Sequence, residues 1–348
     1  MIDFTSFPKR NKGYAGANGN KISIVYNDEV YMIKFPPPPT KNPEMSYTNS
    51  CICEYIGCHI FEIIGIPVQK TMLGTYNVKG KEKIVVACKD FTFPGKQIQD
   101  FASLKNQVIT SPRGGYGTEL SDVLYAIEDQ NSVDPRVLTE RFWDMFIVDA
   151  LIGNWDRHNG NWGFLYDEAT DTQTLAPVFD CGSSMYPQAN DKIMADVLSN
   201  KGELNYRIYE NPTSALQIDG KRIKYYDYIV SLENEDCNAA LKRIMPRIDL
   251  HAMCNMINEI PCISDLQKHF YTTLLSERKE KILDHAYHLL LEKEKNTQRK
   301  SQVFASSLQI FKISVLLPLK AQRRKTIETR DNSTENGGGI LSSTAVAL

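Results

Sequence analysis

Polar residues whose types suit phosphoryl transfer lie within and shortly after the segment LIGNWDRHNGNWGFL, residues 151–165. Asp156 and Asn161 have the D-x-x-x-x-N spacing, in which the aspartate can accept the proton of a substrate hydroxyl and the asparagine can bind Mg²⁺. Asp180 follows the apolar run APVF, where its carboxylate can hold a metal ion between the β- and γ-phosphates of a nucleotide. Together the three residues predict phosphoryl transfer from a nucleotide.

The same spacing also occurs at Asp149/Asn154 and at Asp331/Asn336. About one match is expected by chance in a chain of this length, so the local context has to choose among the pairs. Asp149 lies within an apolar, predicted helical segment, and Asp331 lies in an irregular C-terminal region. Asp156 begins a predicted loop between a buried helix and a strand, and this position favours it as the site residue.

Two charged residues nearer the N-terminus complete this interpretation. Lys34 stands in the strand-like run VYMIKFP and Glu54 on the helix predicted to follow it, so the two can pair as the strand lysine and helix glutamate of kinases do. Taken singly, Lys34 can reach to water from a sheet edge, and Glu54 can be a solvated helix residue. Their joint presence with Asp156 and Asp180 favours the site.

A glycine-rich loop, NKGYAGANGNK, precedes the first predicted strand. Glycines let backbone N–H groups approach phosphates closely, although glycines before a strand more often form an ordinary turn. The loop is therefore weak evidence alone and gains weight from the residues above. Its members expected at the nucleotide are Gly16, Ala17, Asn18 and Gly19.

The first 90 residues are predicted to form a small sheet with one helix packed on it. Apolar runs around polar turns are typical of hairpins, and the four prolines at 36–39 prevent the strand before them from continuing. The predicted elements are a hairpin over residues 22–35, a helix that begins at Ser46 or Asn49 and ends at Gly65, and a second hairpin from residues 68–76 and 83–88.

From about residue 100 the pattern becomes helical. Asp134 is expected to cap a helix that has Pro135 at its first position, is apolar on nearly every face and ends at Gly153. Beyond residue 296 the chain turns to Ser, Thr, basic residues and glycine, which is typical of a flexible tail. The expected parts are an N-lobe over 1–90, a C-lobe over 91–295 with short strands at 162–165 and 175–179 and helices over 220–295, and a tail over 296–348.

The composition excludes several classes of protein. The 348 residues carry 40 Lys+Arg against 42 Asp+Glu, a net charge of −2, which argues against a general polyanion binder. Eight cysteines without a CxxC pair are typical of a reducing compartment. There is no apolar run of the length that spans a membrane and no N-terminal apolar signal core. We therefore expect a cytoplasmic enzyme.

The motifs resemble those of HipA-like serine/threonine kinases. The segment from Asp156 to Asn161 and the later Asp180-Cys181-Gly182 are similar to the catalytic and metal motifs of that family, as are GANGNKIS, YMIKFP, VVACKDF and WDMF. The resemblance covers roughly residues 3–290. It implies an α+β, protein-kinase-like bilobal fold with a β-rich N-lobe and a mostly helical C-lobe, the use of ATP with Mg²⁺, and phosphorylation of protein Ser/Thr.

The resemblance also implies roles for single residues. Lys34 would pair with the ATP phosphates, and Asp156 would be the catalytic base. Asn161 and Asp180 would be the Mg²⁺ ligands. Independently of the resemblance, His158 could either contact the γ-phosphate or stabilise its loop. The hinge that grips adenine through backbone groups would be Val86, Ala87, Cys88 and Lys89.

The chain departs from the family pattern in two respects. HipA toxins carry a further N-terminal domain that packs with a DNA-binding antitoxin, whereas this chain starts almost at the glycine-rich loop, so no antitoxin is expected as a partner. HipA toxins silence themselves by phosphorylating a serine in that loop, and KGYAGANGN contains none. Self-phosphorylation elsewhere, and export into another cell without an N-terminal leader, stay open.

Two alternative functions belong to other classes. A phosphoinositide kinase also uses a D-R-H-x-x-N loop, but the stretch CGSSMYPQANDKIMADVLSNK after Asp180 has only Lys192 before Lys201, too few cations for an anionic head group. A pseudokinase that only binds nucleotide would be expected to lack Lys34, Asp156 or Asp180, and all three are present. A protein kinase is therefore preferred.

Overall fold

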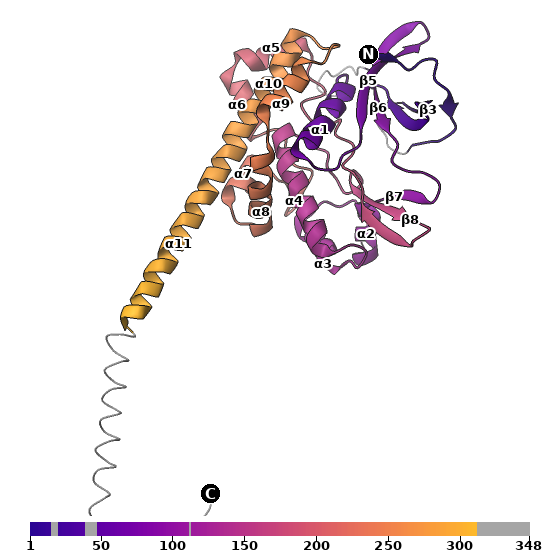
Figure 1. Cartoon of the computed structure of the whole chain (residues 1–348). Helices are drawn as coiled ribbons and strands as arrows, with labels where there is room; N and C mark the ends of the chain where they lie inside the picture. Colours follow the sequence, from indigo (N-terminus) through magenta and orange to yellow (C-terminus); the bar gives the residue numbers. More distant parts are fainter. Residues whose placement is uncertain (15–19, 39–46, 111–112, 312–348) are drawn as a thin grey trace, which may run out of the picture. The chain divides into compact units, whose positions relative to one another are not determined.

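The computed structural model describes residues 1–14, 20–38, 47–110 and 113–311, with side chains as far as residue 307. The chain divides into two units, Met1–Leu290 and Leu291–Leu348, and the elements that position the predicted site all belong to the first. In this unit an N-terminal sheet with one helix is followed by a mostly helical region (Figure 1).

The N-terminal sheet has six strands in the order β1-β5-β6-β4-β3-β2. All neighbouring strands are antiparallel except β1 and β5. The predicted hairpin over residues 22–35 is confirmed, with a turn at Asn27 and Asp28, whose positive φ angles of 48° and 61° suit a two-residue hairpin turn. The strands are β1 (Ile2–Asp3), β2 (Lys9–Arg10), β3 (Lys21–Tyr26), β4 (Glu29–Lys34), β5 (Thr71–Val78) and β6 (Lys81–Lys89).

The second hairpin is longer than predicted. Strands β5 and β6 run into the segment that the sequence assigned to a loop, and they turn at Lys79 and Gly80, which have φ angles of 52° and 83°. A tight turn of this kind lets the pairing continue to Val78 opposite Lys81, because both turn residues adopt the left-handed conformation. The result is a long ladder in which β6 lies between β4 and β5.

Helix α1 (Ser50–Ile64) packs on the sheet beside β5 and β6 (Figure 1). Its end at Gly65 is confirmed, because Gly65 adopts the left-handed conformation that terminates a helix, with φ of 83°. Of the two predicted caps, Asn49 occupies the N-cap position without a capping side-chain hydrogen bond, and Ser46 lies outside the described residues. Side chains on this face of the sheet, such as Val86, pack with Cys51 of the helix.

A three-stranded antiparallel sheet, β7-β8-β9, joins distant parts of the chain. The predicted strand at 175–179 is wrong, since β9 ends at Leu175 and Val178 makes only an isolated bridge to Val68. Thr172, Gln173 and Thr174, which lie in the polar stretch predicted as a turn, instead pair with β8, because threonine suits a strand and β8 supplies the partner. The strands are β7 (Lys96–Asp100), β8 (Gly163–Asp167) and β9 (Thr172–Leu175).

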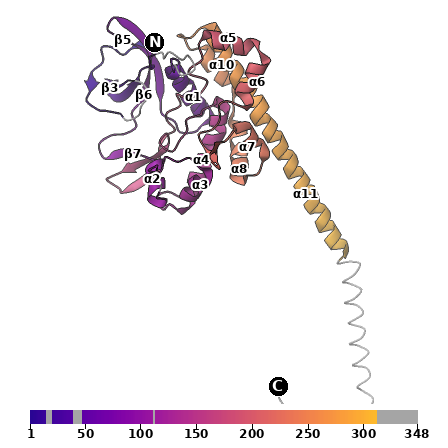
Figure 2. The same cartoon turned by 180° about the vertical axis from the view of Figure 1, so that it is seen from behind.

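The rest of the first unit is helical, apart from a small hairpin of β10 (Gln217–Ile218) and β11 (Lys221–Arg222). Helix α4 is buried along most of its length, begins with the predicted cap Asp134 and Pro135, and ends at Gly153. Figure 2 shows α7 and α8 beside α4. The helices are α2 (Phe101–Val108), α3 (Leu120–Asp129), α4 (Pro135–Ile152), α5 (Asp191–Ser199), α6 (Lys201–Tyr209), α7 (Tyr225–Ser231), α8 (Glu235–Ile244), the 3₁₀ turn Met245–Arg247, α9 (Leu250–Asn258), α10 (Asp265–Arg278) and the π-helical Lys279–Asp284.

Helix α11 (His285–Phe311) extends past residue 296, where the sequence predicted an irregular tail to begin. The stretch contains neither glycine nor proline and is rich in Leu, Glu, Lys, Gln and Ala, which favour the helix even without an amphipathic pattern. Among the described residues no helix has the length and apolarity needed to cross a membrane.

Candidate active site

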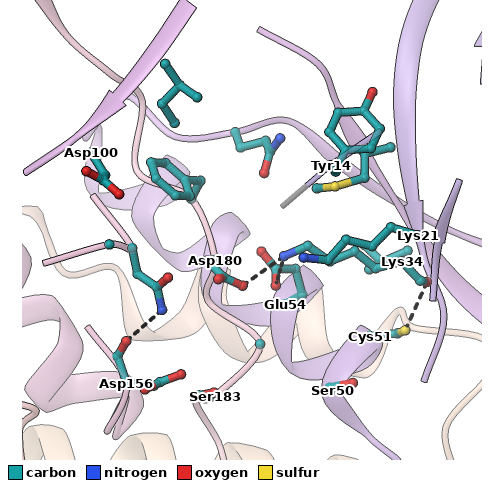
Figure 3. A pocket seen from close by; sticks show the side chains of 18 of the residues that line it. Tyr14, Lys21, Lys34, Ser50, Cys51, Glu54, Asp100, Asp156, Asp180 and Ser183 are labelled. Carbon is teal, nitrogen blue, oxygen red and sulfur yellow. Dashed lines mark hydrogen bonds and ion pairs between the residues drawn. The ribbon is translucent and has the colours of Figure 1, made fainter. Parts of the chain in front are cut away.

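A cavity of about 650 Å³ lies in the first unit, and residues of the N-terminal sheet, helix α1, the loop after α4 and the loop after β9 line it (Figure 3). The structure brings most of the predicted site residues to this cavity although they come from segments far apart in the sequence. Those that line it are Lys34, Glu54, Val86, Asp156, His158, Asn161 and Asp180.

Lys34 is the last residue of β4 and extends into the cavity, where two carboxylates meet its ammonium group. Its Nζ lies 2.8 Å from Oε2 of Glu54 and 2.9 Å from Oδ1 of Asp180. The predicted Lys34–Glu54 ion pair is thus confirmed. Burial opposes the charge of Lys34, but the two carboxylates outweigh it and raise the pKa of the lysine well above its usual value. The ammonium group therefore stays charged.

Glu54 connects helix α1 to the loop that carries Asp180. Its side chain is 2% exposed, and while Oε2 accepts from Lys34, Oε1 accepts a hydrogen bond of 3.1 Å from the backbone N–H of Cys181. Gly182 fits closely beside it, because a Cβ at that position would lie 2.9 Å from Oε2 of Glu54. The carboxylate is therefore fixed on both sides, and a side chain at position 182 would displace it.

Asp180 has a positive φ of 59°, an uncommon conformation that aspartate tolerates better than most residues. In this conformation its carboxylate points toward Lys34 (Figure 3). Burial alone would raise the pKa of Asp180, but the charge and the hydrogen bond of Lys34 outweigh it and hold the pKa below its usual value. The side chain is therefore an anionic oxygen donor, the type of ligand that Mg²⁺ prefers.

Asp156 and Asn161 belong to one loop and are linked by a hydrogen bond. Nδ2 of Asn161 donates to the backbone carbonyl of Asp156 at 2.8 Å, so the amide oxygen remains to accept or to ligate a cation. The Asp156 side chain is 39% exposed toward the cavity. Partial burial of the Asp156 carboxyl and the negative charge of Asp180 raise the pKa of Asp156, and the charge of His158 partly offsets this increase.

His158 lies in the cavity and also stabilises its loop. Its Nδ1 accepts a hydrogen bond of 3.0 Å from the backbone N–H of Gly160, and its Nε2 is 4.0 Å from Oδ1 of Asp156. A Cβ at Gly160 would come within 3.0 Å of this imidazole and 2.8 Å of the Tyr116 ring. The structure is thus compatible with both predicted roles of the histidine.

Arg157, to which the sequence interpretation assigned no role, connects the loop of Asp156 and Asn161 to helix α4. Its Nε is 2.9 Å and its Nη2 3.2 Å from the two carboxylate oxygens of Asp149 in α4. Its Nη1 donates to the carbonyls of Asn161, at 3.0 Å, and of Phe179. Asp149, which begins the alternative D-x-x-x-x-N match, is therefore the buried ion-pair partner of Arg157. The arginine stood within the D-R-H motif, so a signal for it was present.

The predicted hinge over Val86–Lys89 coincides only in part with the residues that line the cavity. Only Val86 of that set lines the cavity, because β6 is an inner strand whose backbone groups pair with β4 and β5. The residues that follow, Asp90, Phe91 and Thr92, line the cavity instead. Within the described residues the backbone of Phe91 makes no hydrogen bond, so its N–H and carbonyl are available to a ligand. Ala87, Cys88 and Lys89, also predicted as hinge residues, do not line the cavity because of their places in the ladder.

Asp90 forms a second connection that the sequence interpretation missed. Its Oδ2 lies 2.6 Å from Nζ of Lys12 and 2.7 Å from the hydroxyl of Tyr14, while Oδ1 accepts from the backbone N–H of Thr92 at 2.9 Å. These contacts tie the chain entering the glycine-rich loop to the strand end beside the cavity. Gly16, Ala17, Asn18 and Gly19 lie outside the described residues.

A sheet lysine paired with a glutamate from the following helix, facing an aspartate and an Asp–Asn loop, defines a protein-kinase-like phosphotransferase. Comparison with known proteins extends this assignment. The model of the family described as HipA-like C-terminal domain matches residues 14–253, and the chain belongs to that family.

The relatives are similar over most of the chain. Serine/threonine-protein kinase CtkA of Helicobacter pylori strain J99 is 53% identical over 289 residues, which cover 82% of this chain and 87% of the relative. The crystal structure of a Helicobacter pylori proinflammatory kinase CtkA has 51% identity and a TM-score of 0.79, with 84% of this chain and 98% of that chain covered. This match confirms the α+β, protein-kinase-like fold.

Proposed function

We propose that this chain transfers the γ-phosphoryl group of ATP, with Mg²⁺, to serine and threonine hydroxyls of proteins. By its family and by its 53% identity to a kinase of this type, the chain is a HipA- and CtkA-like serine/threonine protein kinase. The observation that carries the proposed chemistry is the position of the Lys34 ammonium group, 2.8 Å from Glu54 and 2.9 Å from Asp180. Three distant segments thereby meet where a triphosphate would bind.

The proposed roles follow from the geometry. Lys34 binds the phosphates and is oriented by Glu54, which keeps its ammonium group in the cavity. Asp156 accepts the proton of the incoming hydroxyl, and its raised pKa brings this base nearer to the working pH. Asn161 donates its Nδ2 to the Asp156 carbonyl, which leaves its amide oxygen to ligate a cation. Phe91 offers its backbone groups to the base of the nucleotide, since they make no hydrogen bond within the described residues.

The donor set fits magnesium. Asp180 supplies a carboxylate and Asn161 an amide oxygen, and both line the same cavity. Mg²⁺ is usually bound by one or two protein oxygens together with substrate phosphates and water, so two such ligands suffice. When bound, the ion would neutralise charge on the β- and γ-phosphates. Lys34 contacts the Asp180 carboxylate, and we expect the phosphates to share the lysine.

The other two functions are less well supported. A lipid kinase is not favoured, because the family and the relative over most of the chain point to protein substrates. A non-catalytic nucleotide binder is not favoured either, because Lys34, Asp156 and Asp180 are all present and line one cavity. We also propose that residues 1–90 and 91–295 act as the two lobes. The cytoplasmic location and the independence from a DNA-binding antitoxin stay predictions from the sequence.

The test compares transfer from radiolabelled ATP–Mg²⁺ by the wild type, Asp156→Ala and Asp180→Ala. Asp156→Ala should abolish turnover and largely spare nucleotide binding, because a base acts mainly in the transfer step. Asp180→Ala should also weaken binding of the Mg²⁺–nucleotide, measured by calorimetry. Asp196→Ala is the matched control, since Asp196 is an exposed residue of α5 away from the cavity.

The same assay identifies the class of phosphate acceptor when it contains both a generic protein and phosphoinositide vesicles. Label in Ser and Thr of the protein, located by mass spectrometry, would support the proposal. Label in lipid alone would overturn it. Equal activity of Asp156→Ala and Asp196→Ala would refute the role of the base.

A further inference from the structure

An arginine lies beside the loop of the proposed base. Arg222 stands in β11, directly opposite Gln217 of β10. Its Nη2 donates to the backbone carbonyl of Trp155, the residue before Asp156, and its Nε donates to the carbonyl of Ser214 at 2.8 Å. Two backbone groups therefore hold the guanidinium group in a fixed place next to the catalytic loop.

The hairpin of β10 and β11 is itself anchored. Both carboxylate oxygens of Glu119 bind its turn, since they accept hydrogen bonds of 2.8 and 3.2 Å from the backbone N–H groups of Asp219 and Gly220. Just after the hairpin, the hydroxyl of Tyr225 donates to the backbone carbonyl of Asn154. The segment that carries the arginine is thus attached to the catalytic loop at a second point.

The charge of Arg222 has no partner of opposite sign among the residues that the structure describes. Both of its hydrogen-bond acceptors are neutral carbonyls, and its Nη1 donates to none of the described residues. The residue is exposed. Because an arginine presents five N–H donors in a planar fork that matches a carboxylate, the side chain can still bind an anion from outside the chain.

This anion is more suitably part of the phosphate acceptor than of the nucleotide. Arg222 is not among the described residues that line the cavity, where Lys34 meets Asp180. Burial raises the pKa of Asp156, and the charge of Arg222 is one of those that oppose this increase, so the arginine acts on the base from nearby. An acceptor hydroxyl has to approach Asp156, and the residues that flank it then pass the arginine.

We propose that Arg222 selects protein substrates that carry an aspartate or glutamate close to the acceptor residue. This inference rests on the proposed protein kinase function. An extended chain advances about 3.3 Å per residue, so a carboxylate within about three residues of the acceptor can reach a guanidinium group that contacts the residue next to the base. A phosphoinositide would also supply an anion, but the serine/threonine-protein kinase that is 53% identical favours a protein.

The test uses the whole chain and the generic protein that it labels in the assay above. The residues flanking the labelled serine or threonine are replaced one at a time by Asp, Ala or Lys, and kcat/KM is measured for each substrate. Arg222→Gln removes the charge, and Arg222→Lys keeps it. Lys221→Gln is the matched control, because Lys221 is the exposed neighbour in β11 and projects from the opposite face of the hairpin.

At one or more flanking positions the wild type should prefer Asp to Ala by about threefold to tenfold, since the charge-assisted pair forms with an arginine that is already held in place. Arg222→Gln should reduce this ratio to about one. Arg222→Lys should retain part of the preference, and Lys221→Gln should match the wild type. Damage to the catalytic loop would affect the Asp and Ala substrates equally and therefore cancels in the ratio.

A wild type without preference for Asp, or an equal preference in Arg222→Gln, would overturn the inference and leave the proposed function intact. So would a fall in kcat with every substrate at an unchanged ratio, which would show that the arginine only positions the loop. Loss of lipid labelling alone in Arg222→Gln would assign the arginine to a phosphoinositide head group instead. A wild type that labels no protein would refute the proposed function, and this inference with it.

Discussion

Replacing Arg157 by methionine should destabilise the fold and disturb the site at once. In the wild type the guanidinium group contacts both carboxylate oxygens of Asp149, at 2.9 and 3.2 Å, in the interior. Methionine fills much of the same volume but leaves Asp149 buried without a counter-charge. Breaking a buried ion pair in this way typically costs about 3–5 kcal/mol. We expect a loss of that size in the free energy of unfolding at pH 7.

The control is the exposed pair of Arg136 and Asp134, in which the arginine side chain is 89% exposed. An exposed surface pair contributes little to stability because solvent screens it, so Arg136→Met should be nearly neutral. Urea denaturation monitored by circular dichroism compares the two variants. A double variant, Asp149→Leu with Arg157→Met, should recover part of the loss, because no unpaired charge then remains.

The pH dependence provides a further check. Burial raises the pKa of Asp149 even beside Arg157, and loss of the arginine should raise it more. A carboxyl group whose folded pKa lies above its unfolded value destabilises the protein above the unfolded value, about 3.9, and less so as the pH falls. The deficit of Arg157→Met should therefore shrink as the pH falls from 7 toward the unfolded pKa.

Catalysis should suffer beyond the loss of stability. Arg157 also donates to the backbone carbonyls of Asn161 and Phe179, so its removal releases the two loops that carry the proposed metal ligands. Below the unfolding temperature kcat should fall more than ATP affinity. If Arg157→Met unfolds at the same urea concentration as Arg136→Met, the Arg157–Asp149 ion pair does not stabilise the fold.

Three more predictions follow from the site. Gly182→Ala should lower kcat without unfolding the protein, because its Cβ would lie 2.9 Å from Oε2 of Glu54; activity as high as the wild type would contradict this packing. Asp90→Asn should weaken ATP binding several-fold by loosening the 2.7 Å contact with Tyr14, and calorimetry should find the same change in Tyr14→Phe. Because burial raises the pKa of Asp156, the acid limb of kcat should lie above the usual carboxyl range, and a limb at or below pH 4 in pH–rate profiles would count against Asp156 as the base.

Much of the local structure could be predicted because its causes are local. The hairpin of β3 and β4, the end of α1 at Gly65 and the start of α4 at Asp134 depend on turn, cap and proline chemistry that neighbouring residues dictate. The errors have non-local causes. The strand predicted at 175–179 failed because β9 is decided by its partner β8.

The hinge illustrates the same limit within the site. The sequence VVACKDF marks a strand and its end, but whether its backbone can bind a ligand depends on the neighbours on both sides. Strand β6 has such neighbours over Val86–Lys89, and the N–H of Asp90 still donates to the carbonyl of Val30, so the available groups begin only after the ladder, at Phe91.

By itself the sequence determined which chemical groups are present: a strand lysine, a helix glutamate, a loop aspartate with its asparagine, and a second aspartate. Only the tertiary structure decided which of them meet. It placed Lys34 between Glu54 and Asp180, assigned Asp149 to Arg157, and set Lys21 opposite Lys34. The physical reason is that charge interactions depend on distance and burial, which strand register and helix packing set and residue spacing along the chain does not.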